Sequence, residues 1–246
     1  MITLWYLAYQ DSMRTISVKF GVAKSSVTRS YTRADIFFML SGVIGAIDGC
    51  HIPIKAPSSH QEDYNNRKMT HTVILQAVCD SHGVFTDCFA GVPGSAHDAR
   101  VFSHSNLSQS IQSNVAQHFP DEKYHLVGYC AYALKKWLMV PYKDHGNLKM
   151  AHLKYNRKQS QTRIVIEIAF GHLKNRFRRL KYIDSKIENI PHTIMSACVL
   201  HNFCKYHDVQ DIVESDDSYG VATPQPTGNT SSTAGSLKRD AIANSL

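Results

Sequence analysis

The stretch Ile44-Gly45-Ala46-Ile47-Asp48-Gly49-Cys50-His51-Ile52-Pro53-Ile54 places one carboxylate, Asp48, inside a segment apolar enough to be an interior strand. An unpaired charge there is costly, so Asp48 is expected to need a partner such as a metal ion. A second interpretation stays open, because Asp48-Gly49 between alternating apolar residues is also a β-hairpin signal.

Two more carboxylates stand in distinctive segments. Asp98 lies in the stretch 94–102, and Glu167 lies in the stretch 163–171. Glu167 is one position off the apolar stripe of a predicted helix, four residues after Arg163. This spacing allows an exposed ion pair worth only tenths of a kcal/mol. It also allows a helix that lies over the sheet and brings Glu167 toward Asp48.

Length and charge limit the class of protein. A chain of 246 residues fits one large domain or a domain with appendages. Its 27 Lys and Arg against 20 Asp and Glu give a net charge of +7, which favours nucleic acid over a membrane as partner. No apolar run is long enough to span a bilayer, and the N-terminus lacks a basic secretion start, so an intracellular protein is expected. The six cysteines include no C-x-x-C pair and are predicted to be reduced, mostly buried thiols.

Three regions follow along the chain. Residues 1–33 have the outline of a helix-turn-helix in which Lys24, Ser25, Ser26 and Arg29 could contact DNA, or of a helical hairpin that packs on the main domain. Residues 36–207 are predicted to form one α/β domain. Residues 208–246 turn acidic and then rich in Ser, Thr, Gly and Pro, which predicts a disordered tail.

The middle region predicts a mixed sheet with an antiparallel beginning. Strands are expected at 43–54, 72–79, 84–90 and 124–130, and the first helix near His97. A long helix is predicted at 160–182 and another after Pro191. A basic run follows Glu167 on the long helix, which is typical either of a surface for DNA phosphates or of a solvated helix face. Its members are Lys174, Arg176, Arg178, Arg179 and Lys181.

Five blocks in order resemble the nuclease domain of Harbinger-type (PIF/Harbinger) DDE transposases and the nucleases derived from them. The blocks are Gly45-Ala46-Ile47-Asp48-Gly49-Cys50-His51, Tyr64-Asn65-Asn66-Arg67-Lys68, Gly94-Ser95-Ala96-His97-Asp98-Ala99-Arg100, residues 163–173 and His201-Asn202-Phe203-Cys204. The resemblance implies a ribonuclease-H-like α/β fold. It also implies a DNA endonuclease that uses two Mg²⁺ or Mn²⁺ ions, with Asp48, Asp98 and Glu167 as catalytic metal ligands. The predicted DNA-binding residues are Lys174, Arg176, Arg178 and Arg179 of the basic run.

The chain departs from this family at one position. Where the family pattern places an aspartate after the fourth strand, this chain has Tyr129 in Leu126-Val127-Gly128-Tyr129-Cys130. A phenol is neutral at pH 7 and is a weaker ligand than a carboxylate, so one negative charge is missing.

Two functions therefore remain open. One is a metal-dependent endonuclease impaired at Tyr129, and the other is a catalytically dead relative that binds DNA or a protein partner. The resemblance also implies a Myb-like DNA-binding partner protein and a nuclear location, with a share in the cytoplasm left open. The oligomeric state is not indicated by the sequence.

Overall fold

A computed structural model describes residues 38–207 and 232–246. The predicted helix-turn-helix of residues 1–33 and the segment 208–231 lie outside the described residues. No helix in the described ranges combines the length and apolarity needed to cross a membrane.

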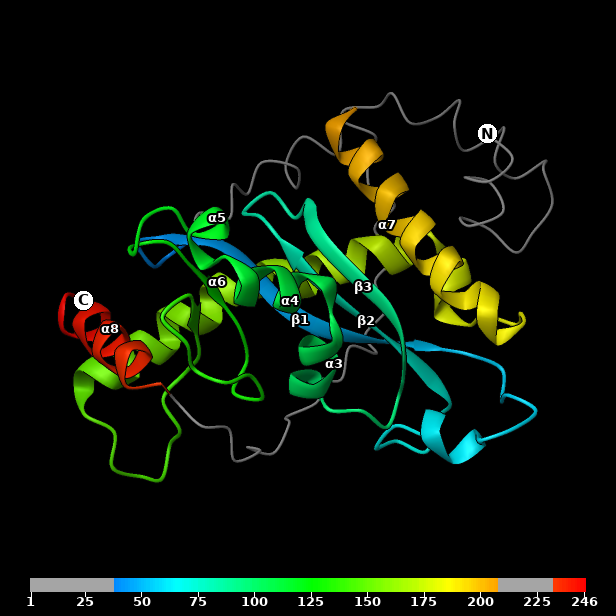
Figure 1. Cartoon of the computed structure of the whole chain (residues 1–246), viewed down its shortest axis with the longest axis horizontal. Coiled ribbons are helices and arrows are strands. Elements are labelled where there is room, and N and C mark those ends of the chain that lie inside the picture. Colours follow the sequence, from blue (N-terminus) through cyan, green and yellow to red (C-terminus); the bar gives the residue numbers. More distant parts are fainter. Residues whose placement is uncertain (1–37, 208–231) are drawn as a thin grey trace.

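The core of the fold is a five-stranded mixed sheet with strand order β3-β2-β1-β4-β5 (Figure 1). β1 (Val43–Pro53) pairs antiparallel with β2 (Thr72–Cys79), which pairs antiparallel with β3 (Phe85–Pro93). On its other side β1 pairs parallel with β4 (His125–Val127), which pairs parallel with β5 (Leu138–Met139). The predicted mixed sheet with an antiparallel beginning is confirmed, and the arrangement is the ribonuclease-H-like α/β fold.

β1 runs unbroken through Asp48 and Gly49, which pair with Ala77 and Gln76 of β2. The alternative of a hairpin turn at Asp48-Gly49 is therefore wrong. Every residue of β2 and β4 is buried, whereas β1 is buried mainly at Gly45–Ile47 and Ile52. Such continuous apolar runs are typical of strands covered on both faces.

Helices cover both faces of the sheet (Figure 1). α3 (Asp98–His104), α4 (Asn106–Ser113) and α5 (Val115–His118) follow β3 and lie in front of the sheet in this view, while α6 (Met150–Arg176) passes behind it. α7 (Ile190–Tyr206) packs along β3. Short 3₁₀ turns lie at Gln61–Tyr64 (η2), Arg178–Lys181 (η3) and Ile187–Asn189 (η4).

The end of the chain corrects one prediction. Residues 208–246 were expected to be a disordered tail, but Thr233–Asn244 form a helix, α8, that packs against α6 and β5. Ser232 caps it by accepting a hydrogen bond from the Gly235 amide at 3.0 Å. The Lys238 ammonium donates to the carbonyls of Glu122, Tyr124 and Lys136 at 2.6, 3.0 and 2.9 Å. Tertiary contacts therefore order a segment whose composition alone would not.

The cysteines follow their prediction in part. Cys79, Cys198 and Cys204 are buried thiols, whereas Cys50, Cys88 and Cys130 are partly exposed, and no disulfide joins any of the six. His201 lies fully buried beside them on α7, with its Nε2 3.0 Å from the Gly83 carbonyl oxygen. This histidine belongs to the packing between α7 and the β2–β3 turn.

Candidate active site

Asp48 is a largely buried carboxylate at the middle of β1. Its Oδ1 accepts a hydrogen bond from the Gly49 amide at 2.9 Å, and its Oδ2 lies 2.6 Å from Arg163 Nη1. The Asp48 side chain is 18% exposed and that of Arg163 is 9% exposed. The partner that the buried charge requires is therefore a guanidinium group of the chain itself.

Arg163 also binds Glu167, one turn later on α6. Its Nη2 lies 2.5 Å from Glu167 Oε1, so both carboxylates are within hydrogen-bonding reach of one guanidinium. Both sequence interpretations of Glu167 are thus partly right. The ion pair at i,i+4 forms, but it lies against the sheet and brings Glu167 into the neighbourhood of Asp48. We call the group Asp48, Arg163 and Glu167 the carboxylate–guanidinium cluster.

Tyr129 borders this cluster. The Arg163 guanidinium carbon lies 5.0 Å from the centre of the Tyr129 ring, a cation–π arrangement. Burial is the main cause that raises the pKa of the Tyr129 phenol, and the negative charge of Asp48 adds to it. The phenol is therefore neutral at pH 7, and the position after β4 adds an aromatic face where a carboxylate was expected.

Asp98 approaches β1 from the face of the sheet opposite to the one on which Asp48 contacts Arg163. It opens α3, and a Cβ atom added to Gly49 would clash with Asp98 Oδ1. Neighbouring residues of a strand point to opposite faces of the sheet, so Asp98 approaches the face that Asp48 does not use. Close approach of this carboxylate explains why a glycine follows Asp48.

Electrostatics still link the three predicted ligands. The pKa of the Asp48 carboxyl is raised to about 6, mainly by burial; the charges of Asp98 and Glu167 add to this rise, while Arg163 and the Gly49 amide oppose it. Burial also raises the pKa of Asp98, against the lowering effect of His97 and Arg67. Burial raises the pKa of the Tyr132 phenol, and the charges of Asp98 and Asp48 raise it further. The Tyr132 hydroxyl accepts a hydrogen bond from the Gln76 side-chain amide at 3.1 Å. Burial, more than the neighbouring negative charges, is therefore the main cause of the raised pKa of Asp48, and Arg163 is the strongest charge acting on it.

The fit to metal is partial. Among residues 38–207 and 232–246, no three His, Cys, Asp or Glu side chains are grouped closely enough to hold a metal ion. Asp48 and Glu167 supply hard oxygen ligands that already share one cationic group, so this pair fits one divalent cation in place of the guanidinium. It does not fit two, because Asp98 lies across the strand and Tyr129 carries no charge.

The predicted DNA-binding run is only partly available. Arg176 is buried at 7% exposure, which is unfavourable for the predicted DNA contact, and that contact stays a prediction. Lys174 donates to the His51 carbonyl at 2.9 Å, and Arg179 donates to the Asp184 carbonyl at 2.7 Å. Arg178 is half-buried. The run therefore fastens the end of α6 and η3 to neighbouring backbone, and a DNA role for Lys174, Arg178 and Arg179 stays a prediction.

Sequence reasoning missed the central role of Arg163. Its spacing to Glu167 was visible, but its pairing with Asp48, 115 positions away, depends on how α6 crosses β1. Gln76 and Tyr132 were missed as well. A glutamine inside an otherwise apolar strand was the available signal for Gln76, since a buried amide needs polar partners.

A ribonuclease-H-like sheet with an acidic cluster between its first strand and a late helix defines the class of the molecule. The family model for the DDE superfamily endonuclease matches residues 47–202. The chain therefore belongs to the DDE superfamily of endonucleases, and the resemblance to the Harbinger-derived nucleases is confirmed.

Several curated relatives are similar to this chain. HARBI1 of rat, which carries the name of a nuclease, is 34% identical over 172 residues, 68% of this chain and 47% of the relative. Human HARBI1 is 33% identical over the same shares, and an ALP1-like protein of Arabidopsis thaliana is 25% identical over 66% of this chain and 43% of its own length. The chain thus spans about half the length of the curated relatives it matches. No solved structure gives a significant match.

Proposed function

We propose that this chain is a transposase-derived, divalent-metal-dependent DNA endonuclease with reduced activity. The observation that carries the proposal is the carboxylate–guanidinium cluster, formed by the middle of the first strand and a late helix of an endonuclease-family domain. Asp48 and Glu167 would hold one Mg²⁺ or Mn²⁺. The bound cation supplies positive charge that polarises the phosphodiester and stabilises the leaving 3′ oxygen.

The residues of the chain have distinct parts in this proposal. Asp48 is held in place by the Gly49 amide and by Arg163, and Glu167 is exposed enough, at 39%, to meet a ligand from solvent. Arg163 neutralises the pair, and a cation held there would compete with its guanidinium for both carboxylates. Asp98, on the other face of β1, adds negative potential without joining this cation.

The second candidate function is a catalytically inactive relative that binds DNA or a protein partner. Tyr129 favours it, because a neutral phenol beside Arg163 replaces an expected anionic ligand. In both functions we propose DNA as the ligand, a Myb-like DNA-binding protein as partner and the nucleus as the main location. These proposals rest on membership of the family. They remain proposals because the chain spans about half the length of its curated relatives.

A nicking assay tests the proposal. Wild-type protein with Mn²⁺ is expected to convert supercoiled plasmid to the open-circular form slowly, and EDTA to stop the reaction. Asp48→Asn and Glu167→Gln each remove one hard anionic ligand and are expected to lower the rate at least tenfold, or about 1.4 kcal/mol of barrier. Nicking that persists unchanged in both variants would assign the activity to a contaminant or to another site.

A further inference from the structure

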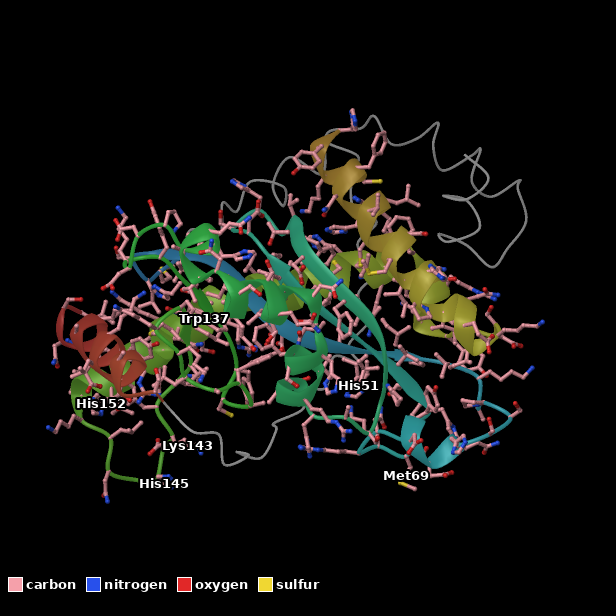
Figure 2. All side chains as sticks on the ribbon, in the orientation of Figure 1. His51, Met69, Trp137, Lys143, His145 and His152 are labelled. Atoms are coloured by element: carbon pink, nitrogen blue, oxygen red, sulfur yellow. The ribbon has the colours of Figure 1, made fainter. Side chains whose placement is uncertain are left out.

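One block of the sequence, Tyr64-Asn65-Asn66-Arg67-Lys68, has no role in the site described above. It enters a loop closed by a β-bridge between Asn65 and His71, which we call the 65–71 loop. The Asn66 side chain accepts from the amides of Lys68 and Thr70 at 2.9 and 3.1 Å, and the Asn66 amide donates to the Thr70 carbonyl at 3.0 Å. Arg67 and Lys68 are therefore presented on an ordered turn, and both side chains are exposed. Figure 2 shows Met69 at the tip of this turn.

The loop is fastened to two parts of the candidate active site. Before the loop, the Asp63 carbonyl accepts a hydrogen bond from the Ser95 amide at 3.1 Å, in the turn that leads to Asp98. After it, the His71 carbonyl accepts from the Ile54 amide at 2.9 Å, and Thr72 Oγ1 lies 2.9 Å from His51 Nδ1 on β1. The loop thus bridges the beginning of α3 and the end of β1.

Positive charge gathers around His51. Lys174 joins from α6 by donating to the His51 carbonyl at 2.9 Å. Burial lowers the pKa of His51, and the three charges that lower it further are those of Lys174, Arg67 and Lys68. Neither Arg67 nor Lys68 forms a salt bridge within the described part of the chain. The nearest acidic residues along the chain, Glu62 and Asp63, belong to η2 and are exposed.

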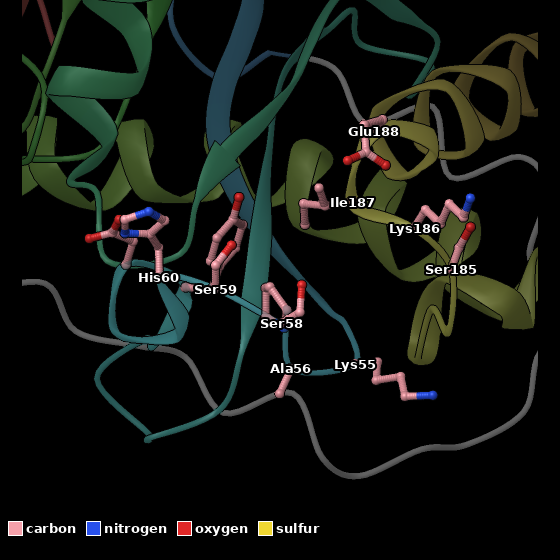
Figure 3. Close-up of a pocket in the computed structure, with 12 residues that line it drawn as sticks. Lys55, Ala56, Ser58, Ser59, His60, Ser185, Lys186, Ile187 and Glu188 are labelled. Carbon is pink, nitrogen blue, oxygen red and sulfur yellow. The ribbon is translucent and has the colours of Figure 1, made fainter.

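A neighbouring pocket of about 540 Å³ is a weaker candidate for an anion. It lies between residues 55–64 and 185–188 (Figure 3), and it is lined by Lys55 and Lys186 but also by Asp63 and Glu188. Lys55 is already paired with Asp184 at 3.2 Å. Mixed charge of this kind does not select a phosphate, whereas the two cations of the 65–71 loop form no salt bridge within the described residues, although the charge of Arg67 acts on Asp98.

We propose that the 65–71 loop, together with His51 and Lys174, binds the phosphodiester backbone of DNA beside the candidate active site. The inference rests on the proposed function, since it names the surface by which the substrate of that site is bound. Cations on a loop and on a helix, placed on either side of the neutral His51 at the end of β1, fit an extended polyanion better than a small anion. Such contacts position a duplex without reading its sequence.

The test measures DNA binding without divalent metal, so it does not depend on cleavage. Affinity for a fluorescent duplex is measured by anisotropy in EDTA over a range of salt concentrations. In the double variant Arg67→Gln, Lys68→Gln, affinity should fall and the slope of log K against log [salt] should become shallower by about 2, because each lost phosphate contact contributes about 0.9.

Matched variants keep the test sharp. Arg67→Lys, Lys68→Arg preserves both charges and should retain the wild-type slope, and thermal melting checks that every variant is folded. Lys143→Gln, Lys149→Gln removes two exposed charges elsewhere and should change the slope little; Figure 2 shows Lys143 far from Met69. A slope and affinity equal to wild type in the loop variant would overturn the proposal. If the loop variant binds DNA more weakly while Asp48→Asn nicks like wild type, only the proposed function fails. If Asp48→Asn loses nicking while the loop variant binds like wild type, only this inference fails.

Discussion

Arg163 determines the state of both cluster carboxylates. Removing the cationic partner of a buried carboxylate strongly destabilises the folded state, so Arg163 is needed for folding whether or not the protein cleaves DNA. A divalent cation held by Asp48 and Glu167 would compete with this guanidinium for both carboxylates. This competition would lower the affinity of the pair for the metal.

Asp48 makes a prediction about stability and pH. Its pKa is about 6 in the folded protein against 3.8 in the unfolded chain, so the folded state binds more protons between these values. Stability contributed by Asp48 is therefore present below about pH 4 and is lost as pH rises to about 6. The difference is on the order of 3 kcal/mol, from about two pKa units at 1.36 kcal/mol each.

The measurement compares wild type with Asp48→Asn by urea unfolding at several pH values. The free energy of unfolding of wild type minus that of the variant should decrease between pH 4 and 6 and stay level above about pH 7. The subtraction removes the titration of other carboxylates. A difference that rises over this window would mean that Arg163, which lowers the pKa of Asp48, outweighs the burial that raises it.

At the scale of elements, α8 covers the end of the sheet. β5 is an edge strand, and α8 packs beside it and against the first half of α6 (Figure 1). Polar contacts fix the helix: the Tyr142 hydroxyl donates to Asp240 at 2.5 Å, and the Arg239 guanidinium lies 3.8 Å from the centre of the Tyr142 ring. A covered edge is protected from pairing with another chain.

Lys238 is expected to be the residue on which the docking of α8 most depends. Lys238→Met keeps the aliphatic stem but leaves three carbonyl oxygens without their shared donor, which should lower the free energy of unfolding by about 1 to 3 kcal/mol. Urea unfolding provides the measurement, with the exposed Lys143→Met as control. Equal stability of the two variants would show that water replaces the ammonium at no cost.

The sequence predicted the elements that have a regular apolar pattern. The strands at 43–54 and 72–79 agree closely with β1 and β2, because both segments are rich in apolar residues that pack into the core. The long helix begins at Met150 instead of residue 160, since its first turns carry mostly polar residues. α8 was missed because its order depends on contacts with β5 and α6, which composition does not contain.

The candidate site was predictable at its carboxylates and not at their arrangement. Asp48 and Glu167 stood out as charges beside apolar residues, and the structure brings them to one guanidinium. Nothing in the sequence indicated that Asp98 would meet Gly49 on the other face of β1. Asp48 and Gly49 are neighbours on β1 and therefore face opposite sides of the sheet. Which of the two Asp98 approaches depends on how α3 packs against the sheet, and the sequence does not contain that information.

At the scale of the whole molecule, the net charge of +7 is divided between structural and available cations. Several basic residues of α6 and η3 bind backbone carbonyls, whereas the 65–71 loop presents its charges to solvent. The predicted helix-turn-helix with Lys24 and Arg29 lies outside the described residues, and its contact with DNA stays a prediction. DNA affinity of the whole chain is the sum of such surfaces, and its dependence on salt counts their phosphate contacts.

The central claim is that this fold carries a nuclease site that lacks one charge, and the rate of plasmid nicking by Tyr129→Asp with Mn²⁺ tests it most directly. The aspartate adds a hard anionic ligand beside Asp48, so the rate should rise about tenfold or more over wild type. This rise corresponds to an activation barrier lower by at least about 1.4 kcal/mol. Tyr129→Asn removes the ring without adding charge and should gain much less. If Tyr129→Asp nicks no faster than wild type while it remains folded, the claim is contradicted and the binding function is the better account.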